Sequence, residues 1–76
     1  MPHVIRYFDK ADESYAGKLE LADIPLNKLQ ELFHTPPEDP MYECFPIHET
    51  QAKFFYEFAK IKLDIESYDY FLEYDA

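Results

Sequence analysis

Basic residues are scarce in this sequence of 76 residues. Seven Lys and Arg stand against 16 Asp and Glu, which gives a formal net charge of −9 at pH 7. Nucleic acids and anionic membrane surfaces are bound by clustered Lys and Arg, so this balance argues against both as direct partners. Glycine is scarcer still, and a single glycine cannot build a glycine-rich loop for binding phosphate.

The sequence also has few cysteines and no long hydrophobic run. Cys44 is the only cysteine, so an intramolecular disulfide is excluded. Small exported domains commonly depend on disulfides, which favours a reducing compartment here. Residues 1–9 contain no signal-peptide-like apolar stretch, and no segment approaches the roughly 18 apolar residues of a membrane span. We therefore expect a cytoplasmic protein.

Hydrophobic and aromatic residues are abundant. They make up 47% and 18% of the sequence, which is too apolar for a disordered chain. The length suits one small domain spanning residues 1–76, and a core of that size cannot enclose a large catalytic cleft. The composition thus indicates a folded acidic domain that carries more aromatic side chains than its core needs.

Alternating β-branched and aromatic residues predict strands at 4–8 and 68–74, the second spanning Tyr68–Tyr74. A return strand is expected at 15–21, where Gly17 suggests a bulge. A third strand is expected at Met41–Phe45, stopped by Pro46. These segments predict an antiparallel sheet of three to four strands.

Two short helices are expected between the strands. Asp23 is a candidate N-cap for the first helix, with Pro25 in its first turn and an end near Phe33 or His34. Thr50 is a candidate N-cap for the second, which would run from Gln51 to about residue 60. The predicted fold is therefore α+β, a four-stranded antiparallel sheet with one or two short helices packed on one face.

Alternation in the first and last strands places Phe8 and Phe71 on the sheet face opposite the expected core. The sequence has no Lys or Arg between Lys28 and Lys53, and none after Lys62, whereas acidic residues occur in both stretches. If the third and last strands are close, these acids form one negative surface. Such a surface can serve solubility alone. Aromatics surrounded by acids, however, are typical of a recognition surface for a basic protein.

No strong catalytic or metal-binding motif is present. His34, Cys44 and His48 are close in sequence, but their spacing matches no common zinc pattern. Cys44 and His48 together would resemble a nucleophile and base, yet nothing nearby in the sequence supplies an oxyanion hole. We expect neither a metal, nor a cofactor, nor enzymatic activity.

Two segments resemble a known family. Residues 5–15 read IRYFDKADESY, and residues 63–75 read LDIESYDYFLEYD. Together they are similar to the cloacin and E-type colicin immunity proteins, which neutralise ribonuclease toxins that cleave ribosomal RNA. Cys44 and Phe45 fall where that family has a Cys-Phe pair on its third strand. The loop at residues 34–40 replaces a glycine- and asparagine-rich segment of the family, so the toxin itself stays undecided.

The resemblance implies a four-stranded antiparallel sheet whose open face meets the basic C-terminal nuclease domain of a cognate toxin. Its aromatic contact sites correspond to Phe8, Tyr15 and Phe71, and its strand cysteine, which influences specificity, corresponds to Cys44. Glu13, Glu43 and Glu73 are our candidates for pairing with Lys or Arg of the toxin. The full set of predicted toxin-binding residues is Phe8, Asp9, Glu13, Tyr15, Tyr42, Glu43, Cys44, Phe71 and Glu73.

The sequence therefore predicts an immunity protein that inhibits a bacteriocin nuclease or the toxin of a contact-dependent growth inhibition system. The free protein is expected to be a monomer or a weak homodimer. Three alternatives stay open: an acidic nucleic-acid mimic that inhibits a DNA-binding protein, a thiol enzyme built on Cys44, and an adaptor whose open sheet pairs with itself.

Overall fold

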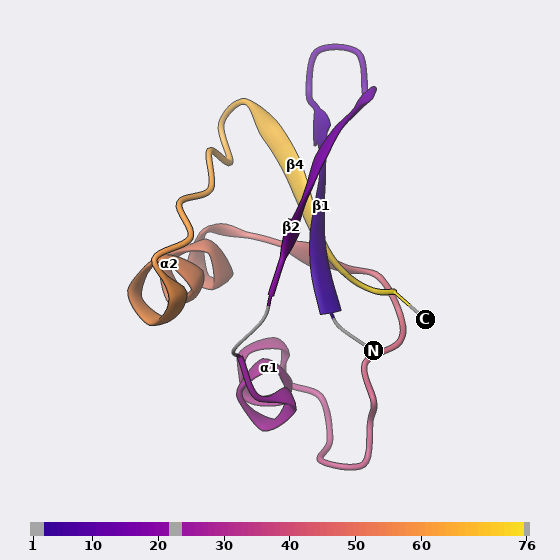
Figure 1. Cartoon of the computed structure of the whole chain (residues 1–76), viewed down its shortest axis with the longest axis vertical. Helices are drawn as coiled ribbons and strands as arrows, with labels where there is room; N and C mark the ends of the chain where they lie inside the picture. Colours follow the sequence, from indigo (N-terminus) through magenta and orange to yellow (C-terminus); the bar gives the residue numbers. More distant parts are fainter. Residues whose placement is uncertain (1–2, 22–23, 76) are drawn as a thin grey trace.

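The four strands form one antiparallel sheet in the order β2-β1-β4-β3. The computed structural model describes residues 3–21 and 24–75 (Figure 1). The elements are β1 (His3–Asp9), β2 (Tyr15–Glu20), α1 (Leu26–Phe33), β3 (Phe45–Ile47), α2 (Glu49–Ala59) and β4 (Tyr68–Tyr74). The predicted α+β fold with its four-stranded antiparallel sheet is confirmed.

The hydrophobic core lies on one face of the central strands. Ile5 of β1 pairs with Leu72 of β4, and both side chains are fully buried. Leu29 of α1 and Phe55 of α2 belong to the same core cluster, so both helices pack on this side of the sheet. The other side of β1 and β4 carries Val4, Arg6, Phe8, Asp69, Phe71 and Glu73. We call it the open face; Val4 is its one fully buried member among these residues.

The third strand is three residues long and starts later than predicted. It spans Phe45–Ile47, so Pro46 lies inside the strand and does not stop it, and the expected strand at Met41–Phe45 is wrong. β3 is an edge strand, where the missing N–H of a proline can face away from the neighbouring strand. Met41 is instead a fully buried core residue with a φ of 58°.

The helix starts also differ from the predictions. α2 begins at Glu49 with His48 as its N-cap residue, so the expected cap at Thr50 is wrong. The backbone N–H of His48 donates to Oε1 of Gln51 over 2.9 Å, which satisfies a donor at the helix start. α1 is preceded by Pro25 at its N-cap position and ends as predicted at Phe33. The candidate cap Asp23 lies outside the described residues.

The predicted bulge in β2 is confirmed, and it determines where Tyr15 points. Tyr7 pairs with Gly17, but Phe8 pairs with Tyr15, so Ala16 is the extra residue. A Cβ on Gly17 would lie 2.6 Å from the hydroxyl oxygen of Tyr7, which explains the glycine. Without the extra residue, Tyr15 would fall on the helix-covered face with Gly17; the bulge moves it to the face of Phe8.

Candidate protein-binding face

Three aromatic side chains meet on the open face. The ring centroids of Phe8 and Tyr15 are 5.7 Å apart, those of Phe8 and Phe71 are 5.9 Å apart, and both pairs are edge-to-face. Tyr15 is 57% exposed, whereas Phe8 and Phe71 are half-buried. We call these three residues the aromatic cluster. The sequence predicted Phe8 and Phe71 on this face. These two rings meet because β1 pairs with β4, and Tyr15 joins them because β1 also pairs with β2.

A network of ion pairs lies beside the aromatic cluster. One guanidinium nitrogen of Arg6 lies 2.9 Å from Oε1 of Glu73, and the other lies 2.6 Å from Oδ1 of Asp75. The ammonium of Lys18 lies 3.4 Å from the second carboxylate oxygen of Asp75. Glu73, a predicted partner for toxin cations, is thus already paired within the chain. Basic side chains therefore lie among the acidic ones on the open face, which is not uniformly negative.

Cys44 borders the same network. Its thiol lies 3.6 Å from Oε2 of Glu73 and donates a hydrogen bond to that carboxylate. Burial, and secondly the negative charge of Glu73, raise the pKa of the Cys44 thiol. At neutral pH Cys44 is therefore a neutral thiol, whereas a catalytic nucleophile needs a lowered pKa. This disfavours the thiol-enzyme alternative.

The ion pairs make the stability of the domain sensitive to acid. The hydrogen bond from Arg6 holds the pKa of the Asp75 carboxyl below its usual range. A carboxyl with a lowered folded-state pKa stabilises the fold above its unfolded pKa, and this stabilisation is lost as the pH falls through the folded pKa. The expected loss therefore lies below about pH 4, the usual value for aspartate.

Replacing Arg6 with glutamine is expected to remove part of this acid sensitivity. The variant loses the charged guanidinium that lowers the pKa of Asp75, so the difference in Tm between pH 6 and pH 3 should become smaller than in the wild type. Thermal unfolding followed by circular dichroism at both pH values measures it. Lys28→Gln, at an exposed position of α1, removes the same charge and should keep the wild-type difference. An unchanged difference in the Arg6 variant would show that this network does not contribute.

The other predicted binding residues lie at the margins of the open face. Asp9 accepts a hydrogen bond from the backbone N–H of Ala11 over 2.8 Å. Glu13 has a φ of 60°, and its backbone N–H donates to the carbonyl of Asp9 over 2.7 Å. Both residues shape the β1–β2 turn next to Phe8 and Tyr15, and Glu13 is exposed there.

Tyr42 and Glu43 precede β3 and are both exposed. The ring of Tyr42 packs on that of Tyr74 with centroids 4.3 Å apart. Tyr74 alternates to the face opposite Glu73, so Tyr42 does not join the aromatic cluster. Of the nine predicted residues, the structure gathers five on the open face: Phe8, Tyr15, Cys44, Phe71 and Glu73.

Three further residues of this face were not among the predicted binding residues: Arg6, Lys18 and Pro46. Arg6 shares the face of Phe8 by simple alternation, so its position was visible in the sequence. Lys18 depends on the register of β2, and Pro46 on the register of β3, where it pairs with Phe71. Neither register can be read from the sequence of one strand.

Neither a metal site nor a membrane helix is found in residues 3–21 and 24–75. No three His, Cys, Asp or Glu side chains there are grouped to hold a metal ion. No helix in that part of the chain is long and apolar enough to cross a membrane.

Comparison with protein families shows which family the chain belongs to. The family model described as "Domain of unknown function (DUF7683)" matches residues 2–73. The chain belongs to the DUF7683 family. The matched range includes the whole aromatic cluster together with Arg6, Cys44 and Glu73, so these residues of the open face belong to the DUF7683 domain. No curated protein matches the sequence significantly.

Proposed function

We propose that this DUF7683 protein is an immunity protein that binds and neutralises a basic bacterial nuclease toxin through its open sheet face. The toxin is a ribonuclease domain of a bacteriocin or of a contact-dependent growth inhibition system. One observation carries the proposal: Phe8, Tyr15 and Phe71 form an aromatic cluster on the face opposite both helices, in a chain with a net charge of −9.

The aromatic cluster suits the centre of a tight interface. Binding energy in protein interfaces is concentrated in a few aromatic or Arg residues that become fully desolvated. Here Tyr15 is still largely exposed, and the rings of Phe8 and Phe71 are half-buried. A partner that covers these rings removes apolar surface from water, which contributes roughly 25 cal/mol per Å².

Net charge supplies the second part of the mechanism. An excess of nine negative charges attracts a basic protein from a distance and raises the association rate at low salt. Exposed carboxylates at the margins of this face, such as Glu13 and Glu43, are the candidate partners for cations of the toxin. Inhibition would follow from covering the active site of the toxin, or from binding beside it and repelling RNA.

The nucleic-acid mimic fits this face less well. A mimic needs carboxylates arranged like phosphates, free to meet the cations of a DNA-binding protein. On this face Glu73 pairs with Arg6, and Asp75 pairs with both Arg6 and Lys18. Aromatic rings occupy the neighbouring positions.

The experiment is a binding measurement with the C-terminal domain, roughly 100 residues, of the protein encoded immediately upstream. We expect tight, salt-sensitive association that abolishes RNA cleavage. Glu43→Lys should slow association several-fold at low salt and weaken its salt dependence. Glu31→Lys on α1 changes the net charge equally on the helix side and should have a smaller effect. Lack of binding to this nuclease domain would overturn the proposed function, and salt-independent association would refute electrostatic steering.

A further inference from the structure

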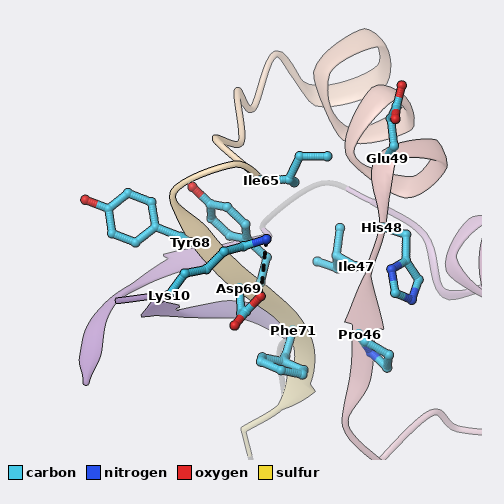
Figure 2. A pocket seen from close by; sticks show the side chains of 10 residues that line it. Lys10, Pro46, Ile47, His48, Glu49, Ile65, Tyr68, Asp69 and Phe71 are labelled. Atoms are coloured by element: carbon cyan, nitrogen blue, oxygen red, sulfur yellow. Dashed lines mark ion pairs between the residues drawn. The ribbon is translucent and has the colours of Figure 1, made fainter. Parts of the chain in front are cut away.

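A small pocket lies where the edge of the sheet is incomplete. β3 ends at Ile47 opposite Tyr70, but β4 already begins at Tyr68, and the chain turns into α2 at Glu49. The space left beside the first residues of β4 is a pocket of about 170 Å³ (Figure 2). Its lining includes Phe71, which also belongs to the aromatic cluster, so the pocket is continuous with the open face.

The pocket has an apolar interior and a charged rim. Ile47 and Ile65 face the space between β3 and the segment that leads into β4, whereas the carboxylate of Glu49 points away from it (Figure 2). Asp69 lies at the rim on the same side of the sheet as Phe71. An occupant that matches both parts needs an aliphatic stem and a cationic head.

A backbone acceptor also faces this space. The N–H of Lys10 donates to the carbonyl of Ser67 over 3.1 Å, which makes these two residues a hydrogen-bonded pair across β1 and β4. Because the pattern alternates along an antiparallel ladder, the carbonyl of Tyr68 points to the opposite side, toward the position where β3 would continue. The pocket thus combines a carboxylate, a carbonyl oxygen and the ring of Phe71.

We propose that this pocket binds an arginine side chain of the partner. This inference rests on the proposed function in one respect, namely that the arginine belongs to the basic toxin. The stem would pack on Ile47 and Ile65, and the planar guanidinium would bond Asp69 and the Tyr68 carbonyl while lying near Phe71. A guanidinium suits this combination better than an ammonium, because it presents several donors in one plane and stacks on aromatic rings.

Lys10 already occupies the position of the cationic head in the free protein. Its ammonium lies 3.7 Å from Oδ1 of Asp69, longer than the 2.7–2.9 Å of a strong charge-assisted hydrogen bond. Both side chains of this pair are about half exposed, so the pair contributes little and is readily replaced. The arginine of the partner displaces Lys10 and gains the same carboxylate with better geometry.

The test uses a small probe and does not need the toxin. N-acetyl-arginine methylamide is titrated into the full chain, and NMR shifts are followed at Ile47, Ile65, Asp69 and Phe71. The matching citrulline compound has nearly the same shape without the charge. We expect saturable shifts at these residues with the arginine compound only. Equal shifts with citrulline, or shifts spread over Glu73 and Asp75, would overturn the proposal.

Two variants and one control variant test whether binding is specific to this pocket. Asp69→Asn should weaken binding of the arginine compound at least about fivefold. Lys10→Gln removes the internal competitor and should tighten binding about threefold. Lys18→Gln removes an equal charge from the pair with Asp75 and should change nothing at the pocket. If Asp69→Asn binds like the wild type, or Lys10→Gln no more tightly than Lys18→Gln, the pocket does not bind arginine in this way.

The same variants separate this inference from the proposed function. A toxin domain that binds Asp69→Asn as tightly as the wild type would overturn the arginine pocket and leave the immunity function standing. A toxin domain that does not bind at all would overturn the immunity function. The titration with N-acetyl-arginine methylamide would still decide whether the pocket accepts arginine.

Discussion

Replacement of Phe71 by alanine is expected to raise the dissociation rate of the toxin domain about 30-fold. The ring contacts Phe8 in the aromatic cluster and also lines the pocket at the end of β3, so its removal affects both binding features. Truncation of a central aromatic anchor typically costs about 2 kcal/mol or more of binding free energy, and most of the loss is in the dissociation rate. Surface plasmon resonance with immobilised nuclease domain measures this rate directly.

Phe58→Ala is the matched control for this variant. It removes an aromatic ring that is 46% exposed on α2, on the side of the sheet away from the open face. Its dissociation rate should equal that of the wild type. Thermal unfolding of both variants shows whether the fold is intact. A wild-type dissociation rate for a folded Phe71→Ala protein would remove Phe71 from the set of anchors.

Replacement of Phe55 by alanine is expected to lower the free energy of unfolding by about 3–5 kcal/mol. Phe55 is fully buried and joins α2 to the core beneath the sheet. A domain of this size has a net stability of roughly 4–11 kcal/mol, so this single change brings it close to unfolding. Urea denaturation followed by circular dichroism measures the loss.

The neighbouring residue supplies the control for the core prediction. Tyr56 is 54% exposed on the same helix, and Tyr56→Ala should change the free energy of unfolding by less than about 1 kcal/mol. Phe55→Leu keeps most of the apolar volume, so it should be destabilised by less than Phe55→Ala and should stay folded. If Phe55→Ala were as stable as Tyr56→Ala, α2 would contribute little to the core.

Much of the sheet and the centre of the candidate site could be predicted because strand alternation is a local property. Successive side chains of a strand point to opposite faces, so the positions of Phe8 and Phe71 follow once β1 and β4 are recognised. The distribution of acids also pointed to one surface, and β3 does pair with β4. The third strand was misplaced because a proline rule for central strands was applied to an edge strand.

The remaining features depend on contacts between segments far apart in the chain. The charge of the open face was overestimated because Arg6 meets Glu73 and Asp75 only through the pairing of β1 with β4. The pocket could not be predicted from the sequence, because it results from the difference in length between the paired strands β3 and β4. Such registers are set by packing and pairing across the whole sheet, not by the residues of one strand.

By itself, then, the sequence determined an acidic α+β domain with Phe8 and Phe71 on the face opposite the core, because charge count and alternation are properties of the chain alone. The tertiary structure decided that Tyr15 joins them, since one extra residue in β2 turns its side chain to the other face. It also decided that Arg6 pairs with Glu73 and Asp75 and that Lys10 and Asp69 border a pocket, because ion pairs and pockets depend on which strands become neighbours.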